Sequence, residues 1–335
     1  MTWTWGIGVF MTLVLSYTLT RLVLWCLRRI NLVDLPNARS SHTIPTPRGG
    51  GIAIVGAMVA AFFWSTQIAS DAFLEISAAI GLGVILAAIS FVDDLRPLPV
   101  APRLLAQTAA VIVGLWTLPE GGQVFQGLFS PAVDQVITAI LWIWFINLYN
   151  FMDGIDGITG IETLTISIGS CIVLFFGNMH PQLNFLTACL GSAVLGFLWW
   201  NRHPARIFLG DVGSVPIGFW VGWILLTLAA SGYWIPAVLL PLYYLVDATI
   251  TLSRRTARGH KMWHAHADHY YQRAARSLGQ HNLVTRAILI VNLGLVLLAV
   301  LSIIFTDQKL LFLVIGVSLA LALICYFATR RSTIA

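Results

Sequence analysis

Five aspartates stand at the borders of long apolar stretches of this chain, in settings that offer no obvious cation. They are Asp93, Asp94, Asp153, Asp156 and Asp211. A carboxylate close to hydrocarbon is costly unless an opposite charge compensates it. A divalent cation that also binds a diphosphate would compensate several carboxylates at once. The residue types therefore predict a site for a cation and a diphosphate at the edge of a membrane.

Asp93 and Asp94 are adjacent at the end of the third apolar stretch. Two neighbouring carboxylates repel, so one of them needs a cation, a proton or an arginine partner. In the structural interpretation, Arg96 and Arg103 simply neutralise the end of a helix. Carboxylates are unfavourable at a helix C-terminus, however, because the helix dipole is negative there. We therefore favour a functional pair.

Asn150, Asp153 and Asp156 recur at intervals of three residues between the fifth and sixth stretches. If this turn is helical, their oxygens lie on one side, while Gly154 and Gly157 let the backbone approach a phosphate closely. The alternative is an interfacial turn in which Asn and Asp cap a helix. A turn rarely requires three such side chains beside apolar spans, so we favour a functional cluster.

Asp211 precedes the eighth stretch, and taken alone it is best explained as the N-cap of a helix. As a fifth carboxylate on the same rim, it fits the cation site better. Arg48 is followed by three glycines. Their backbone N–H groups would form an anion-binding nest or only a loose entry into the second helix, and both interpretations are equally open.

The longest polar stretch, 253–286, combines arginines, histidines and aromatic residues, which suit a nucleotide diphosphate. His264, His266 and His269 have a spacing compatible with zinc, but without cysteine this is a weak zinc signal. A solvated basic loop that binds anionic lipid is another interpretation. We favour substrate recognition by this loop.

The elements that must position these residues are membrane-spanning helices. The 335-residue chain is 58% hydrophobic and only 10% charged, which excludes an ordinary water-soluble fold of this length. The sequence predicts an all-α, polytopic integral membrane protein with about eleven transmembrane helices, ten being the alternative count. The stretches are 5–27, 50–69, 73–92, 103–119, 134–151, 158–177, 183–200, 212–230, 233–252, 287–305 and 310–329.

The basic residues predict the orientation of these spans. With the N-terminus outside, 18 of the 19 Lys and Arg residues lie on the inner side, as the positive-inside rule requires. All five aspartates then lie on the cytoplasmic face, and no nucleic acid is needed to explain the basic charge. We expect a retained first helix and one membrane domain, 1–335, that includes the inner segment 253–286.

Together the motifs resemble a known family, the polyprenyl-phosphate N-acetylhexosamine-1-phosphate transferases of glycosyltransferase family 4 type. The resemblance covers nearly the whole chain, and its motifs follow one another in order at span ends. They are Pro-Arg48-Gly-Gly, Asp93-Asp94, Asn150-x-x-Asp153-Gly-x-Asp156-Gly, Leu209-Gly-Asp211-x-Gly-Ser and the His-rich last loop. The resemblance implies an enzyme of the bacterial cytoplasmic (inner) membrane that depends on Mg²⁺, with Mn²⁺ as a substitute.

The resemblance also implies roles for single residues. Asp211 matches the family's magnesium ligand, and we expect Asp94 to share the metal. Asp93 and Asp94 match its aspartate pair, of which one member would activate the lipid phosphate. The expected catalytic residues are Asp93, Asp94, Asp156 and Asp211, and the expected substrate-binding residues are Arg48, Arg103, Asn150, Asp153, His264, His266 and His269.

The implied reaction transfers an N-acetylaminosugar 1-phosphate from a UDP-sugar to undecaprenyl phosphate in the lipid bilayer and releases UMP. The peptidoglycan enzymes of the family carry three adjacent histidines, whereas this chain has His264-Ala-His266-Ala-Asp268-His269. This departure favours the enzymes that initiate O-antigen chains over a peptidoglycan role. A homodimer is compatible with the pattern but not required by it.

Several rival functions use the same residues. A transporter or proton-coupled carrier also needs intramembrane acids, but near the midplane, whereas these aspartates lie at one rim. A teichoic-acid or peptidoglycan lipid-intermediate transferase is the alternative within the family. A non-catalytic lipid-binding scaffold would explain the basic loop but not the cluster around Asn150.

Overall fold

The computed structural model describes residues 3–36, 44–67, 73–119, 122–260 and 267–329, and nearly all of them are helical. The helices are α1 (Trp3–Arg29), α2 (Gly51–Ser65), α3 (Phe73–Leu95), α4 (Val100–Leu115), α5 (Pro131–Phe151), α6 (Ile158–Phe176), α7 (Pro181–Asn201), α8 (Asp211–Ala230), α9 (Trp234–Leu239), α10 (Leu242–Ala257), α11 (Tyr270–Leu278), α12 (His281–Ile304) and α13 (Lys309–Thr329). A 3-10 turn, η1 (Thr306–Gln308), precedes α13, and two short strands, β1 (Val33–Asp34) and β2 (Thr46–Pro47), pair antiparallel. The prediction of an all-α protein is confirmed.

The part of the chain that the structure describes contains eight helices long and apolar enough to cross a membrane. They are α1, α3, α5, α6, α7, α8, α12, and α13 together with η1, while α2 and α4 are apolar but shorter. The architecture is that of a multi-pass membrane protein, as predicted, but the predicted count of about eleven spans exceeds the eight long apolar helices of the described residues, because the second and fourth predicted spans form the shorter helices α2 and α4.

Two further predicted spans differ from the observed helices. The ninth, 233–252, is interrupted, because α9 ends at Leu239 and α10 begins at Leu242, directly after Pro241. Proline has no backbone N–H to continue a helical hydrogen-bond ladder. The tenth, predicted from residue 287, begins earlier, at His281. Its first turn is polar, so hydropathy alone could not reveal it.

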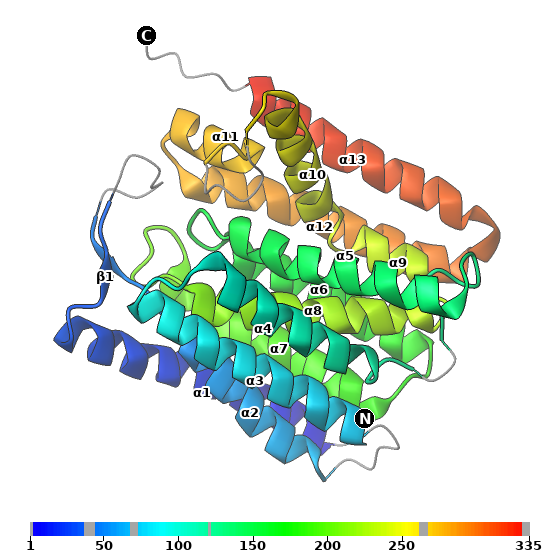
Figure 1. Ribbon diagram of the computed structural model, residues 1–335, viewed down its shortest axis with the longest axis horizontal. Coiled ribbons are helices and arrows are strands. Elements are labelled where there is room, and N and C mark those ends of the chain that lie inside the picture. The colour runs from blue at the N-terminus through cyan, green and yellow to red at the C-terminus, as the bar shows by residue number, and fades with distance from the viewer. Residues whose placement is uncertain (1–2, 37–43, 68–72, 120–121, 261–266, 330–335) are drawn as a thin grey trace.

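Helix α8 forms the centre of the bundle, packed against α2, α3, α5, α6 and α9 (Figure 1). Nearly all of its residues are buried. Small residues let its neighbours approach: a Cβ on Gly222 would lie 2.7 Å from the Trp142 ring, and a Cβ on Gly218 would lie 2.9 Å from Tyr149, both on α5. Close backbone approach at glycine is a general device for packing helices in membranes.

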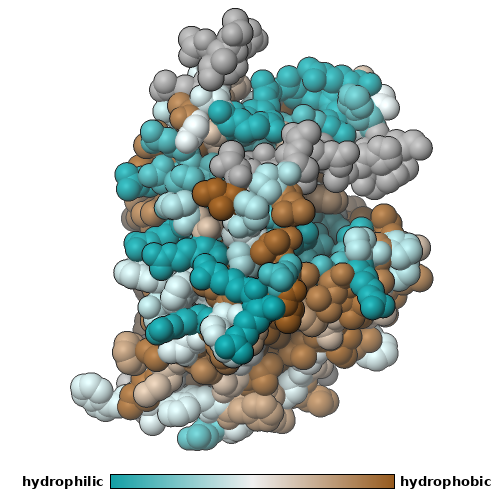
Figure 2. Space-filling view, turned by 90° about the vertical axis from the view of Figure 1, so that its left-hand side faces the viewer, coloured by the Kyte–Doolittle hydropathy of each residue, from teal (hydrophilic) through white to brown (hydrophobic). Residues whose placement is uncertain are grey.

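The motif residues meet at one end of this bundle. Helices α3 and α5 end there, α2 and α8 begin there, and β1 lies on the same side, at the left of Figure 1. Hydrophilic side chains gather on this face, which Figure 2 shows head-on. The N-terminus of α8 therefore lies at the end of the bundle that carries the polar face of the molecule.

Candidate active site

The start of α8 is held by backbone pairing between two segments far apart in sequence. The N–H groups of residues 49–51 donate to the carbonyl oxygens of Phe208 and Leu209 over 2.8–3.2 Å. These donors are not available to an anion, so the interpretation of the three glycines as an anion-binding nest is wrong. Gly51 instead lets α2 touch α8, because a Cβ there would overlap with the backbone of Gly213.

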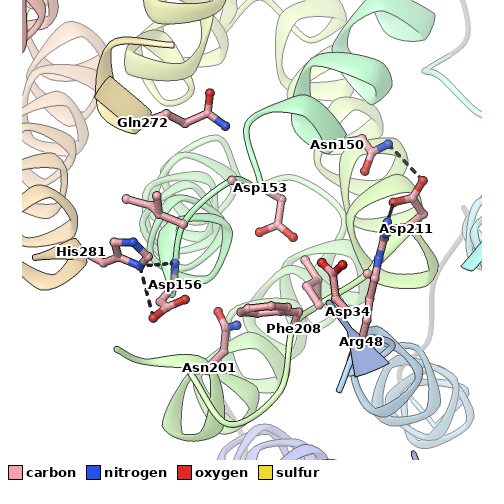
Figure 3. Close-up of a pocket in the computed structure, with 14 residues that line it drawn as sticks. Asp34, Arg48, Asn150, Asp153, Asp156, Asn201, Phe208, Asp211, Gln272 and His281 are labelled. Carbon is pink, nitrogen blue, oxygen red and sulfur yellow. Dashed lines mark hydrogen bonds and ion pairs between the residues drawn. The ribbon is translucent and has the colours of Figure 1, made fainter. Parts of the chain in front are cut away.

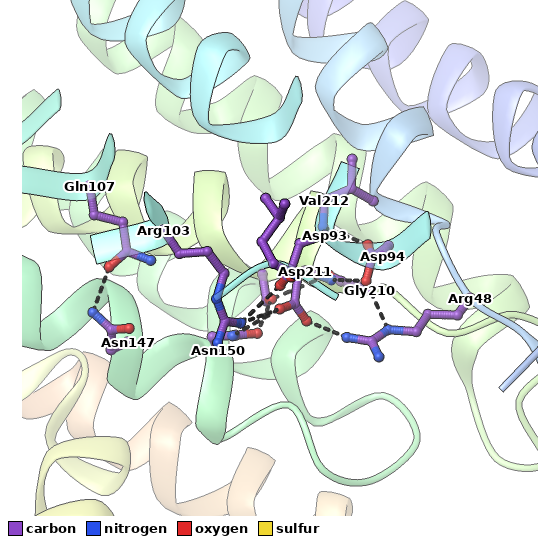
Figure 4. A network of polar contacts seen from close by, with 12 residues as sticks. Arg48, Asp93, Asp94, Arg103, Gln107, Asn147, Asn150, Gly210, Asp211 and Val212 are labelled. Atoms are coloured by element: carbon purple, nitrogen blue, oxygen red, sulfur yellow. Dashed lines mark hydrogen bonds and ion pairs between the residues drawn. The ribbon is translucent and has the colours of Figure 1, made fainter. Parts of the chain in front are cut away.

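Asp94 caps α8 from the end of α3. Its carboxylate accepts the N–H of Asp211 at 3.2 Å and of Val212 at 2.9 Å, and it pairs with Arg48 at 3.0 Å (Figure 4). The first N–H groups of a helix have no partner within the helix, and the helix dipole favours a negative charge there. Gly210 permits this approach, since it has a φ of +77° and a Cβ on it would lie 2.7 Å from an Asp94 oxygen. Asp94 therefore fixes the position of Asp211.

The Asp211 carboxylate lies between two guanidinium groups. Arg48 forms a short hydrogen bond with its Oδ1, Arg103 lies 3.8 Å from its Oδ2, and the Asn150 amide nitrogen lies 3.4 Å from the same oxygen (Figure 4). Burial disfavours the charge of Arg48, yet Asp211 and Asp94 raise the pKa of its guanidinium above the ordinary value. Both arginines are therefore charged neighbours of Asp211 and can bind phosphate oxygens.

Asp93 turns away from Asp94 and holds Arg103. Its carboxylate accepts the N–H of Leu98 at 2.6 Å and pairs with Arg103 at 2.8 Å. Each carboxylate of the adjacent pair thus has its own arginine, Arg48 for Asp94 and Arg103 for Asp93. The repulsion expected between the two carboxylates is relieved by these separate ion pairs.

A cavity of about 240 Å³ opens beside Asp211 (Figure 3). The polar residues on its wall are Asp34, Arg48, Asn150, Asp153, Asp156, Asn201, Asp211, Gln272 and His281. Five of the predicted site residues therefore line one cavity. Asp93, Asp94 and Arg103 do not line it, but they contact one another or residues that do. The three-residue spacing of Asn150, Asp153 and Asp156 would have placed these side chains on one side of a helical turn. The segment between α5 and α6 is not helical, but its Asp side chains and Asn150 still line the same cavity.

Asp153 and Asn150 are held at the end of α5. Ser214 on α8 donates its hydroxyl hydrogen to Asn150 Oδ1 at 2.6 Å, which orients the Asn150 amide toward Asp211. Burial raises the pKa of Asp153 to about 6. Asp153 therefore changes its charge near pH 6, because burial outweighs the opposing effects of Thr159 and Arg48 on its pKa.

Asp156 brings together two histidines that the sequence did not single out. Nδ1 of His203 lies 2.6 Å and Nδ1 of His281 lies 3.2 Å from the same Asp156 oxygen, which also accepts the N–H of Ala205 at 3.1 Å. Although burial alone would raise it, these partners hold the pKa of Asp156 below its ordinary value. His203 follows α7 and His281 begins α12, so only the fold brings them together. Their placement on predicted inner segments was the one signal in the sequence.

Two places in the structure have the chemistry to hold a divalent cation. The ligand atoms of Asp156, His203 and His281 lie within 4.8 Å of one another, and two imidazoles with one carboxylate suit a transition metal ion. Asp211 instead offers carboxylate oxygens at the edge of the cavity, while the Asn150 oxygen already accepts the Ser214 hydroxyl. Carboxylate oxygens with room for water ligands are the environment that Mg²⁺ prefers, so Asp211 fits magnesium.

The predicted histidine loop is only partly described. His264 and His266 lie outside the described residues. His269 does not line the cavity: its side chain is buried, and its Nδ1 lies 3.2 Å from Asp247 on α10. Asp247 also accepts the N–H groups of Tyr270 and Tyr271 at 3.1 and 3.2 Å, so this carboxylate fixes the start of α11.

An apolar cavity of about 700 Å³ lies between α5, α8, α9 and α10. Its wall includes Trp144 and Phe145 from α5, Leu225 and Leu226 from α8, and Val238 from α9. Phe145 and Asn150 belong to the same helix, and five residues of α-helix span about 7–8 Å. The apolar cavity therefore begins within one to two helical turns of the polar one.

Comparison with known proteins finds a family match over the region that carries this site. Residues 76–229, which include the aspartate pair, the Asn150 cluster and Asp211, match the family Glycosyl transferase family 4. A decaprenyl-phosphate N-acetylglucosaminephosphotransferase from Mycolicibacterium smegmatis is 28% identical over 342 residues, covering 88% of this chain and 81% of that protein.

Two further relatives match over shorter regions. The decaprenyl-phosphate N-acetylglucosaminephosphotransferase of Mycobacterium leprae is 30% identical over 230 residues, covering 61% of this chain and 56% of that protein. The phospho-N-acetylmuramoyl-pentapeptide-transferase of Caldanaerobacter subterraneus subsp. tengcongensis is 32% identical over 192 residues, covering 52% of this chain and 58% of that protein. These two matches span little more than half of each relative.

Proposed function

We propose that this chain, which matches glycosyl transferase family 4 over residues 76–229 and is similar to polyprenyl-phosphate hexosamine-1-phosphate transferases, transfers an N-acetylaminosugar 1-phosphate from a UDP-sugar to undecaprenyl phosphate, releasing UMP. The observation that carries the proposal is the junction at α8, where Asp211 lies between Arg48 and Arg103 beside one polar cavity. Such an arrangement supports a cation site with two guanidinium groups near the phosphates.

The charges explain what the site must do. Both reactants are anions, so Coulomb repulsion opposes their approach. An oxygen of the lipid phosphate attacks the sugar-linked phosphorus in line, the bond from that phosphorus to the bridging oxygen breaks, and UMP leaves with that oxygen. Arg48, on the cavity wall, binds the phosphate oxygens, and Arg103, on the other side of Asp211, adds a second positive charge. A Mg²⁺ ion (or Mn²⁺) held by Asp211, with Asn150 beside it, would neutralise further phosphate charge.

The aspartate pair acts mainly by position in this proposal. A phosphate monoester has a second pKa of about 6 and is largely dianionic at pH 7, so a strong general base is dispensable. Asp93 and Asp94 are each committed to an arginine, and Asp94 also to the N-terminus of α8. We therefore assign them to orienting Arg103, Arg48 and Asp211 rather than to proton removal.

The apolar cavity would receive the prenyl chain. Its wall is almost wholly hydrophobic and aromatic, as expected for an isoprenoid site. Because α5 contributes Phe145 to this cavity and Asn150 to the polar one, a lipid that lies along α5 would bring its phosphate to Asp211. The lipid bilayer supplies this substrate, and the UDP-sugar enters from the cytoplasm.

The biological role that we propose is the initiation of O-antigen or a related surface polysaccharide in the bacterial cytoplasmic membrane. The spacing of the histidines in the last loop supports this role over the peptidoglycan one. A teichoic-acid or peptidoglycan lipid-intermediate transferase is the second candidate, which the similarity to phospho-N-acetylmuramoyl-pentapeptide-transferases supports. A carrier is disfavoured, because the carboxylates gather at the ends of helices.

The experiment that tests the proposal is a substrate panel. The purified full chain in detergent, with polyprenyl phosphate and Mg²⁺, is incubated with UDP-N-acetylglucosamine, its 6-deoxy N-acetylated analogues, or UDP-N-acetylmuramoyl-pentapeptide. UMP and the lipid-linked product are measured, with a control that lacks lipid. We expect lipid-dependent UMP release from an N-acetylaminosugar. Release from the pentapeptide substrate alone would exclude the O-antigen role, and no release from any donor would exclude the transferase.

A further inference from the structure

Gln272 is a buried polar side chain on the wall of the active-site cavity, and its amide oxygen accepts no hydrogen bond from the residues that the structure describes. Its exposed fraction is only 6%. The side chain extends from α11 toward the turn that carries Asp153 (Figure 3). A buried amide oxygen without a partner is uncommon in proteins, and a ligand in the cavity would satisfy it.

The position of this amide is fixed by its surroundings. Asp247 holds the first N–H groups of α11, and the hydroxyl of Tyr271 donates to the carbonyl oxygen of Phe151 at 3.4 Å. The Gln272 amide packs directly on Gly154, where any Cβ would overlap with its nitrogen. The glycine therefore makes room for an amide that is already placed before a ligand arrives. Such preorganisation is typical of residues that determine specificity.

The chemistry of the group defines what it recognises. A carboxamide presents one acceptor and one donor side by side in a plane. Its complement is a cis amide or an imide, in which a C=O and an N–H stand side by side on one edge. In a UDP-N-acetylaminosugar the imide edge of the uracil carries this pattern, whereas the acetamido group of the sugar is trans and offers its C=O and N–H on opposite sides, so it can form only one hydrogen bond with this carboxamide.

We infer that Gln272 is a specificity-determining residue whose carboxamide hydrogen-bonds either the uracil imide or the acetamido group of the nucleotide-sugar donor. This inference rests on the proposed function, since it requires a UDP-sugar in the cavity. It adds α11 to the substrate site and explains why Asp247, although outside the cavity, holds the start of that helix so firmly. Asp247 is then a positioning residue for Gln272.

The test uses Gln272→Leu, which keeps the size of the side chain and removes the amide. Because Oε1 has no partner within the described part of the chain, we expect the melting temperature of this variant to equal or exceed that of the wild type. A structural role would lower it. Gly154→Ala, which pushes the amide aside, should reproduce the binding defect.

Binding of UDP-N-acetylglucosamine, UDP-glucose and UMP is measured by calorimetry on the full chain in detergent, independently of turnover. Loss of the hydrogen bonding to this carboxamide should weaken binding about 10- to 100-fold. If the acetamido group is the partner, Gln272→Leu weakens UDP-N-acetylglucosamine alone and removes its advantage over UDP-glucose. If uracil is the partner, all three ligands weaken together.

Gln182→Leu serves as the matched control. Gln182 is also buried with an unpartnered Oε1, but it lies on α7 and outside the cavity. Its substitution should leave all three affinities unchanged. Wild-type affinities in Gln272→Leu would overturn the inference while leaving the proposed function intact. A wild-type protein that binds no uridine nucleotide would instead refute the proposed function itself.

Discussion

The carboxylate of Asp94, at the end of α3, accepts the backbone N–H of Val212, in the first turn of α8, at 2.9 Å. A residue of one membrane helix thus caps another, and the capped helix carries Asp211 as its first residue. The same carboxylate pairs with Arg48, which in turn pairs with Asp211. The residue that we propose as the cation ligand is therefore positioned by an acidic residue that does not line the cavity.

Replacing Asp94 by Asn is expected to reduce stability and activity together. The amide oxygen of Asn can accept one of the two N–H groups of α8. Arg48, however, loses one of its two carboxylate partners, so we expect the free energy of unfolding to fall by about 1–3 kcal/mol. Thermal unfolding in detergent and UMP release are measured on the same preparation. A variant that unfolds at the wild-type temperature but has lost activity would instead indicate a direct chemical role.

The location of the site could be predicted from the sequence, but its internal contacts could not. Each of the five aspartates stands where an apolar stretch meets a polar one, and this border is visible in the residue order. The partners of Asp94 are backbone N–H groups of a distant helix, and those of Asp156 are His203 and His281 from two other segments. No local pattern encodes such contacts, because they exist only after α3, α7, α8 and α12 have packed.

The fold shows the same limit. Hydropathy located α8 as a span but not its central position, which depends on glycines such as Gly222 meeting Trp142. The break at Pro241 lies within a stretch that is apolar throughout, so a hydropathy profile reads it as continuous. The three glycines after Arg48 left two interpretations open, and only their bonds to Phe208 and Leu209 decided between them.

Asp153 makes the stability of the protein depend on pH. Burial raises its pKa from 3.8 to about 6, so between these values the unfolded chain loses the proton first. The stability that the neutral form contributes is therefore lost as the pH rises through this window. The free energy of unfolding of Asp153→Asn should exceed that of the wild type by roughly 1–3 kcal/mol at pH 7.5 and by less at pH 5.

The measurement is thermal unfolding of the wild type and of Asp153→Asn at these two pH values. Asp307→Asn serves as a control, because Asp307 lies on the exposed turn that follows the C-terminal end of α12. The same difference at both pH values would show that Asp153 titrates normally.

Glu162 is expected to tolerate glutamine better than any apolar residue. It is fully buried in α6 and accepts the Asn292 amide of α12 at 2.6 Å, while Glu162 Oε1 and Asn292 Oδ1 have no partner among the described residues. Glu162→Gln keeps the acceptor and supplies a donor for Asn292. Its melting temperature should equal or exceed that of the wild type.

The matched variant is Glu162→Ala, which leaves a cavity and an unpaired Asn292 amide and should cost about 2–4 kcal/mol. If Glu162→Gln unfolds as readily as Glu162→Ala, the carboxylate has a role beyond joining α6 to α12.

The apolar cavity can be filled to test its role in lipid binding. Val238→Trp places a large side chain on its wall and should raise the KM for polyprenyl phosphate about 10-fold or more, with little change in the KM for the UDP-sugar. Leu195→Trp is the control, because Leu195 is 42% exposed on α7 and does not line this cavity. An equal rise in both KM values, or no rise in either, would show that the prenyl chain does not bind in this cavity.

The most direct test of the account is Mg²⁺-dependent release of UMP by Asp211→Asn. The account predicts a loss of at least about 100-fold in rate, which excess Mg²⁺ restores only in part, because a cation ligand between two arginines is missing. The folded structure should persist, since Arg48 keeps its pairing with Asp94. Wild-type turnover with unchanged Mg²⁺ dependence in a folded Asp211→Asn protein would contradict it.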